Sequence, residues 1–441
     1  MAQAPPHTCR SVSDVSEPGL LTRDLAAATR SGPFDHLRDA GVVVLVFLVV
    51  PTVGAISEHA GHRVLWLTTL IVAASTLALA LPVSARLLAL HRPVLPLVAA
   101  WVLAVSMLLS LLANSPRVDA GYFWTGAAFV GAALASSVAV MDEGRVVRFV
   151  TAPLLGAAAL QAVLMAAQTV TGNPFGLRLV EPGVELSVID GILRPQGTMG
   201  HVFEPALFAT VALAAAAVCA RRIGSHPLWL FLIGVAAGTI SLSLSRTALL
   251  AAVVLVVGLV LAHRRGTAGA RNVAAAIAIG VVAASVFVAP GWMTKAEHSA
   301  STNLDELSLG RVTLMRQAIE IIGDHPLIGV GTASYLRVLG EEYEPDPDHP
   351  FSVHNASLRL MADLGIPLGL LVTALIIGAG VQAFRAGTLA ATAFTAMAPW
   401  LVFDINYYDR ISGHLLFGVW LGVVAYALLR GRHASRAIKS S

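Results

Sequence analysis

Apolar runs long enough to cross a lipid bilayer recur from residue 40 to residue 429. A helix needs about 20 predominantly apolar residues to span the hydrocarbon core of a bilayer. On that criterion the chain holds about twelve spans: 40–57, 64–84, 94–113, 120–141, 149–170, 203–220, 227–242, 246–263, 272–290, 358–383, 387–404 and 411–429. Charged residues make up only 12% of the chain, against roughly 25% in soluble domains. The sequence therefore predicts an all-α, polytopic transmembrane helical bundle.

One long polar stretch, residues 291–357, interrupts this series of spans. Within it, Val312, Met315, Ile319 and Ile322 recur at helical spacing, which predicts an amphipathic helix with its apolar face toward the membrane. We expect five segments along the chain: a disordered cytoplasmic tail over 1–38, nine spans over 39–290, the large loop over 291–357, three spans over 358–429 and a basic tail over 430–441.

The distribution of Lys and Arg predicts how the chain is oriented. Cytoplasmic loops of membrane proteins carry the excess of these residues. With both termini inside the cell, the inner segments hold 18 of the 29 Lys and Arg residues and the outer segments hold 11. We therefore expect a multi-pass protein of the cytoplasmic membrane, surrounded by lipid, with the loops 171–202 and 291–357 outside. The net charge of +3 is too small to indicate a nucleic-acid partner.

Three arginines on the predicted outer side are candidate ligands of an anion. Arg194 lies just before a span, Arg311 lies in the large loop, and Arg246 joins two spans that have almost no loop between them. A boundary Arg often extends only to the lipid headgroups. Arg246, however, follows Ser243 and Ser245, and hydroxyls with an Arg at a helix N-terminus make a plausible anion site.

His354 and Asn355 lie at the far end of the large loop, directly before an apolar span. A His side chain titrates near neutral pH and can act as a general base. The nearby segment 341–349 is acidic and rich in Pro. Its carboxylates could hold a divalent cation, but the irregular spacing of its residues fits a solvated loop better.

These segments together resemble a known family. The order of RPQGTMG at 194–200, SLSR at 243–246, Gly310-Arg311, HPLIGVG at 325–331, and His354-Asn355 with LGIPLG at 364–369 resembles the O-antigen ligases and Wzy-type polymerases, which are bacterial membrane glycosyltransferases. The resemblance covers about residues 190–385. No single motif is specific, but the ordered set is.

The resemblance implies an activity and roles for these residues. It implies transfer of a glycan from a polyprenyl-diphosphate donor outside the cytoplasmic membrane, with no cofactor and no required metal. Arg246 and Arg311 match arginines that hold the donor diphosphate, His354 matches the residue that activates the acceptor, and Arg194 fits a third basic position. Ser243, Ser245 and Asn355 are further candidates for substrate binding.

Several alternatives remain open at this stage. Met315 and Asp363 stand where relatives often carry Trp and Glu, which leaves the acceptor open: a lipid, a protein or a glycan. Ligation and polymerisation break the same donor bond and are not separated by the sequence. A secondary transporter or lipid-glycan flippase would also have about twelve spans, but it would place ionisable residues near the middle of the bilayer.

Overall fold

The structure of the chain is a computed structural model, and it describes residues 35–44, 62–88, 93–114, 120–173, 188–189, 192–199, 203–300, 311–343, 353–404 and 411–440. Two of the features predicted from sequence, the tail over residues 1–34 and most of the acidic segment after Tyr343, lie outside them.

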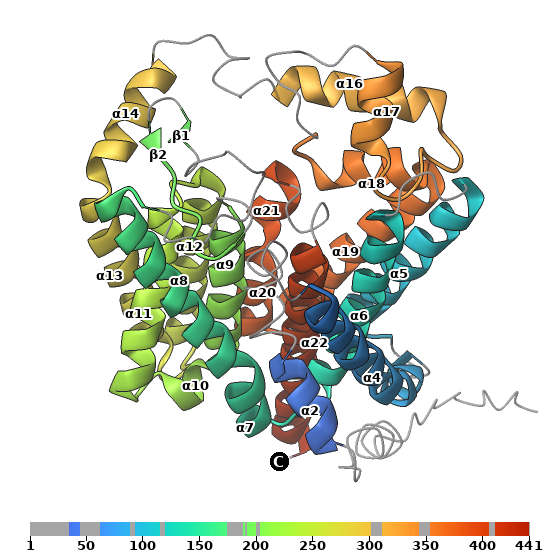
Figure 1. The fold of residues 1–441 in the computed structure, drawn as a ribbon. Coiled ribbons are helices and arrows are strands. Elements are labelled where there is room, and N and C mark those ends of the chain that lie inside the picture. The colour runs from blue at the N-terminus through green and yellow to red at the C-terminus, as the bar shows by residue number, and fades with distance from the viewer. Residues whose placement is uncertain are drawn as a thin grey trace, which may run out of the picture.

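The described residues form a bundle of helices (Figure 1). The helices of the first half are α2 (Asp35–Val44), α4 (His62–Leu88), α5 (Leu95–Asn114), α6 (Ala120–Ala139), α7 (Glu143–Val146), the π-helical turn η2 (Val147–Thr151), α8 (Ala152–Thr171), α9 (Glu204–Val218), α10 (Ala220–Ile223) and α11 (Pro227–Leu242). Those of the second half are α12 (Arg246–Arg264), α13 (Ala270–Phe287), α14 (Ala289–Ala300), α16 (Arg311–Asp324), α17 (Tyr335–Glu342), α18 (Ala356–Leu364), α19 (Ile366–Ala386), α20 (Thr388–Thr395), α21 (Ala398–Phe403) and α22 (Ile411–Ser440). Two short strands, β1 (Val188–Ile189) and β2 (Ile192–Leu193), pair antiparallel.

The all-α fold predicted from the apolar runs is confirmed. Seven described helices are long and apolar enough to cross a membrane: Leu95–Asn114, Gly121–Ala139, Glu143–Thr171, Arg246–Arg264, Ala270–Phe287, Ile366–Ala386 and Ser412–Gly431. Four shorter apolar helices are Ala74–Leu88, Glu204–Val218, Pro227–Leu242 and Thr388–Phe403. The predicted total of twelve spans is not confirmed, and of the first one, 40–57, only the residues up to Val44 are described.

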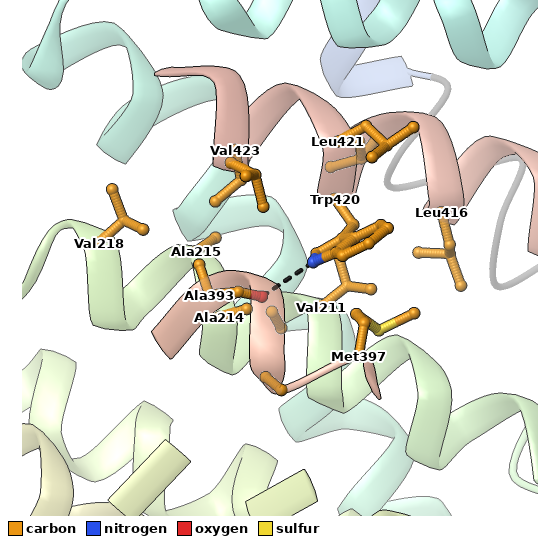
Figure 2. Close-up of a cluster of buried hydrophobic side chains, with 14 of the residues drawn as sticks. Val211, Ala214, Ala215, Val218, Ala393, Met397, Leu416, Trp420, Leu421 and Val423 are labelled. Carbon is orange, nitrogen blue, oxygen red and sulfur yellow. Dashed lines mark hydrogen bonds between the residues drawn. The ribbon is translucent and has the colours of Figure 1, made fainter. Parts of the chain in front are cut away.

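Helix α22 runs through the centre of the bundle. The part of α22 that is long and apolar enough to cross a membrane, Ser412–Gly431, is 94% buried, because α6, α9, α19 and α20 pack around it. Figure 2 shows the core at Trp420, whose indole nitrogen donates a hydrogen bond to Ala393 O (2.8 Å) among side chains of α9, α20 and α22. This bond satisfies the one polar atom of a large buried side chain, which lets an aromatic residue fill the core without a desolvation cost.

The bundle has two distinct ends (Figure 1). The end that carries β1, β2, α14, α16 and α17 is called the loop end, and the end that carries α7, α10 and the C-terminus is called the C-terminal end. Both outer loops predicted from sequence reach the loop end. Arginines assigned to the inside, such as Arg145, Arg222, Arg265, Arg385 and Arg430, lie in elements or helix ends at the C-terminal end. These five arginines and the two long loops therefore lie at opposite ends of the bundle.

The predicted span 358–383 is wrong at its start. The chain forms two helices there, α18 and α19, which are separated at Gly365. Gly365 has a φ of +81°, a conformation that ends a helix and that side chains with a Cβ rarely adopt. Pro367 follows in the first turn of α19, where its fixed φ suits a new helix. The large loop thus extends to residue 365, and it contains helices α14, α17 and α18 besides the expected α16.

The predicted boundary of the N-terminal tail at residue 38 falls within α2. The helix is attached to α7 by charged side chains at the C-terminal end, because Arg145 Nε donates a hydrogen bond to Asp39 Oδ2 (2.7 Å). Arg38 also pairs with Asp35 (3.2 Å). Burial lowers the pKa of the Arg38 guanidinium, although the two carboxylates oppose that shift. Residues 35–38 are therefore part of the folded bundle.

Candidate functional site

The segment that carries Arg194 is held by two glutamines of α8. Gln168 Oε1 accepts hydrogen bonds from the backbone nitrogens of Gln196 (3.1 Å) and Gly197 (2.8 Å), and its Nε2 donates to Gly197 O (3.0 Å). Gln161 Oε1 accepts from Thr198 N (2.8 Å), and its Nε2 donates to Thr198 Oγ1 (2.6 Å). Five hydrogen bonds from two side chains fix the path of a segment that has no helix or sheet of its own.

Arg194 is buried beside the start of α9. Its side chain is 4% exposed, and its guanidinium carbon lies 6.0 Å from the centre of the Phe203 ring, which is within the range of a cation–π contact. This burial argues against the interpretation that Arg194 extends to the lipid headgroups. The side chain belongs to the interior of the loop end.

The Ser-Leu-Ser-Arg motif forms the turn between α11 and α12. Leu244 adopts a positive φ of 53°, which reverses the chain within three residues. Ser243 Oγ donates to Ile240 O (2.7 Å) and accepts from Ser245 N (3.3 Å). Ser245 is the N-cap of α12, since its Oγ accepts from Ala248 N (3.2 Å). Ser243 and Ser245, both predicted as ligands, therefore use their hydroxyls to stabilise the turn that precedes Arg246.

The turn at Leu244 and the segment at Gly197 meet on one helix. Leu244 packs in a cluster with Ala162 and Met165 of α8. A methyl group built on Gly197 would lie 3.5 Å from Met165 Cγ. The first two motifs of the ordered set start at residues 194 and 243, and both contact α8 toward its loop end.

Arg246 is the first residue of α12, and its side chain is exposed at the loop end. The first backbone N–H groups of a helix have no partner within the helix and carry partial positive charge. The guanidinium adds a full positive charge at the same point. The arrangement suits an anion such as phosphate.

The fourth and fifth motifs, HPLIGVG and LGIPLG, interlock through their backbones. Val330 N donates to Ala362 O (2.9 Å), Gly331 N donates to Asp363 O (3.1 Å), and Ile366 N donates to Pro326 O (2.8 Å). Any side chain on Gly329 would overlap the backbone of Asp363, and one on Gly365 would overlap that of Leu327. The HPLIGVG and LGIPLG motifs are therefore two halves of one structure.

Helix α16 forms where the sequence predicts it, and a second apolar face, which was not predicted, packs against the protein. Leu314, Ala318 and Ile321 are buried, and α16 packs against α18. Of the four apolar residues predicted to face the membrane, Ile322 is buried in the protein whereas Val312, Met315 and Ile319 are exposed. Arg311 is the first residue of α16, and its side chain lies outside the part of the chain that the structure describes.

A buried ion pair that the sequence analysis did not single out supports this loop. Arg359 Nε donates to Asp363 Oδ2 (3.1 Å), and the two side chains are 1% and 0% exposed. The Arg359 guanidinium lies 4.6 Å from the Tyr335 ring centre, and Asp363 Oδ1 accepts from Tyr335 N (3.2 Å). The signal in the sequence was an Arg and an Asp four residues apart in an apolar stretch.

His354 and Asn355 lie at the start of α18. Asn355 caps the helix, because its Oδ1 accepts from Leu358 N (3.0 Å), and its Nδ2 donates to Val402 O of α21 (3.4 Å). His354 is half-buried directly before this cap. Helix α21 also packs against α12. The helices that begin next to His354 and at Arg246 thus adjoin the same short helix at the loop end (Figure 1).

The first residues of the acidic segment have structural partners. Glu341 pairs with Arg337 (2.6 Å), Glu342 lies 3.8 Å from His325, and the Tyr343 hydroxyl donates to Asp324 of α16. Burial, and then the Asp324 carboxylate, raise the pKa of Tyr343 to about 12. In the described part of the chain, no three His, Cys, Asp or Glu side chains gather as metal ligands would.

Residues 229–373 match a family model described as O-antigen ligase. Over this stretch the chain is similar to the O-antigen ligase family. The match contains SLSR, HPLIGVG and His354-Asn355, and it supports a role in membrane glycan transfer of the ligase or polymerase type. Arg194 precedes the matched residues, so its connection to them rests on the shared contact with α8. No curated protein matches the chain.

Proposed function

We propose that the protein is a member of the O-antigen ligase superfamily and that it transfers a glycan from a polyprenyl-diphosphate donor to an acceptor hydroxyl at the outer face of the cytoplasmic membrane. The acceptor is a surface lipid, a protein or another glycan. In the reaction the acceptor oxygen forms a bond to the anomeric carbon of the donor. The bond from that carbon to the diphosphate oxygen breaks, and polyprenyl diphosphate leaves.

Arg246 and Arg311 are assigned to the diphosphate. Negative charge develops on the leaving diphosphate as the bond breaks, and guanidinium groups stabilise it with two parallel hydrogen bonds each. The start of α12 supports this assignment for Arg246, because the helix N-terminus contributes further N–H donors at the same point. Arg194, Ser243 and Ser245 complete this half of the site.

His354 is assigned to the acceptor. A neutral imidazole takes the proton of the attacking hydroxyl as the new bond forms. Asn355, beside it, orients the acceptor or the glycan. The observation that carries the proposal is the position of α21, which contacts both α12 and the Asn355 amide. It joins the donor half and the acceptor half at one end of the bundle.

The first test is Arg246→Ala, compared with Arg264→Ala at the other end of the same helix. Both arginines are exposed, so both variants should fold and reach the membrane. Loss of one charged contact to the transition state costs a factor of roughly 10²–10³ in rate. We expect that loss for Arg246→Ala alone, measured as glycan transfer from a purified polyprenyl-diphosphate donor in detergent. Equal rates for the two variants would exclude the assignment of Arg246.

The same assay tests the other two residues. Arg311→Ala should lose activity to a similar extent, and near-normal product on a glycan gel would contradict its role at the diphosphate. His354→Ala should also lose activity at neutral pH. Full activity of that variant would remove the general base from the proposal and leave the diphosphate site unaffected.

A further inference from the structure

Two large apolar side chains are exposed in the turn that follows α16. Leu327 is 73% exposed and Ile328 is 50% exposed. Both lie in the HPLIGVG motif, within the large polar loop. Their neighbours in the fold are the ends of two membrane-crossing helices, α5 and α19.

The turn is bonded to these two helices at their loop ends. Asn114 Nδ2, at the last residue of α5, donates to Ile328 O (3.3 Å). Ile366 N, at the first residue of α19, donates to Pro326 O (2.8 Å). Lower on α5, Met107 O accepts from the Thr332 hydroxyl (2.9 Å). The turn is thus fixed beside α5 rather than above the bundle.

Helix α5 sets the depth of the turn in the bilayer. Its 20 residues extend about 30 Å, which matches the thickness of the hydrocarbon core. Its last residue contacts the turn, so the turn lies at the edge of the hydrocarbon. Leu109 and Leu112 of α5, Leu370 of α19 and Tyr122 of α6 are exposed near the same ends. Leu327 and Ile328 therefore lie at the same end of the bundle as exposed apolar side chains of helices that we expect to face lipid, with a Tyr at the level where aromatic residues meet the headgroups.

Five backbone groups of the turn meet the condition for contact with lipid. Non-helical backbone at membrane depth is tolerated only where its polar groups find partners within the protein. Pro326 O and Ile328 O accept the bonds described above, and Gly329 N donates to His325 O (3.1 Å). Val330 N and Gly331 N donate to α18 (2.9 and 3.1 Å). These groups are directed into the protein, while the two apolar side chains are exposed.

We propose that Leu327 and Ile328 insert into the outer leaflet of the bilayer and hold the α16–α18 part of the loop at the membrane surface. The occupant is bulk lipid, and the contact does not depend on the donor. The role differs from the one predicted from the amphipathic pattern, because the attachment lies in the turn after α16.

The test measures the depth of a spin label in vesicles of phosphatidylethanolamine and phosphatidylglycerol that contain no polyprenyl lipid. The label is placed at Leu327→Cys in a Cys9→Ser background; the native Cys219 is buried. Collisions with oxygen report a lipid environment, and collisions with a water-soluble nickel chelate report an aqueous one. Val105→Cys, exposed in the middle of α5, is the lipid control. Gly340→Cys is the aqueous control, since its new side chain would meet nothing within 4 Å.

We expect the ratio of oxygen to nickel collisions at residue 327 to exceed that at residue 340 several-fold and to approach that at residue 105. A ratio at 327 equal to that at 340 would overturn the proposal. A ratio that rises only after polyprenyl diphosphate is added would also overturn it, because the occupant would then be the donor. Each labelled protein is first shown to elute as the unmodified protein does, so that only folded samples are compared.

Discussion

At the scale of single residues, Gly172 and Gly197 have the same positive φ of 63° but different surroundings. Gly172 ends α8 in open space, whereas a side chain on Gly197 would overlap the Gln161 amide. We expect Gly172→Ala to cost only the backbone strain of about 1–2 kcal/mol. Gly197→Ala should cost more and should displace the segment that carries Arg194. Thermal unfolding in detergent and glycan transfer measure the two effects.

The difference between these two alanine variants isolates the glutamine contact, because the backbone strain is common to both. We expect transfer activity to fall in Gly197→Ala and to stay near normal in Gly172→Ala. Equal losses of stability and activity would mean that the hydrogen bonds from Gln161 do not position Arg194. The further variant Gln161→Ala should then leave activity unchanged as well.

The sequence identified Arg194 but not the residues that hold it. Gln161 and Gln168 lie seven residues apart, on one face of a span. Two amides on one face of an apolar helix are expensive to bury without partners, so they indicate a polar contact. The partner was not predictable, because it is the backbone of a segment about 30 residues away that has no periodic pattern.

At the scale of elements, the loop contains two Arg–acid pairs at the same four-residue spacing. The Arg359–Asp363 pair in α18 is buried, and the Arg337–Glu341 pair in α17 is partly exposed, with side chains 26% and 57% exposed. We expect Asp363→Ala to destabilise the protein by about 3–5 kcal/mol, because it leaves the Arg359 charge buried without its counterion. Glu341→Ala should cost at most about 0.5 kcal/mol. Thermal unfolding of both variants in the same detergent checks the difference.

A second measurement separates the loop from the rest of the bundle. Because Asp363 also bonds to Tyr335 N, its loss should release α17 from α18 and increase proteolysis within the loop. Glu341→Ala should leave the proteolysis pattern unchanged. If Asp363→Ala unfolded at the wild-type temperature with an unchanged pattern, the pair would not be what holds the loop together.

Periodicity predicted the presence of α16 but not its orientation. The helix carries two apolar stripes, one with Val312, Met315 and Ile319 and one with Leu314, Ala318 and Ile321. A helical pattern shows which residues share a face, but it does not show which face the neighbouring helix covers. The choice is made by α18, whose path depends on the interlocked glycines at 329 and 365. For the same reason the sequence predicted one span where α18 and α19 form two helices.

At the scale of the whole molecule, the excess of positive charge lies at the C-terminal end of the bundle and the two long loops lie at the opposite end. Arg264 ends α12 at the C-terminal end, whereas Gly340 of α17 lies at the loop end (Figure 1). The excess of Arg at the C-terminal end predicts that this end is cytoplasmic. The proposed transfer reaction requires the same orientation, because the acceptors considered above lie outside the cell membrane.

Labelling of cysteines in intact cells tests this orientation. In a Cys9→Ser background, we expect Gly340→Cys to react with a thiol reagent that does not cross the membrane, and Arg264→Cys to react only after the cells are lysed. Both positions are exposed, so a difference in reactivity reports the side of the membrane and not burial. The opposite pattern would place Arg246 and His354 on the cytoplasmic side. The depth of Leu327 in the bilayer would be unaffected, since it depends only on the position of the turn beside α5, but transfer to an external acceptor would be excluded.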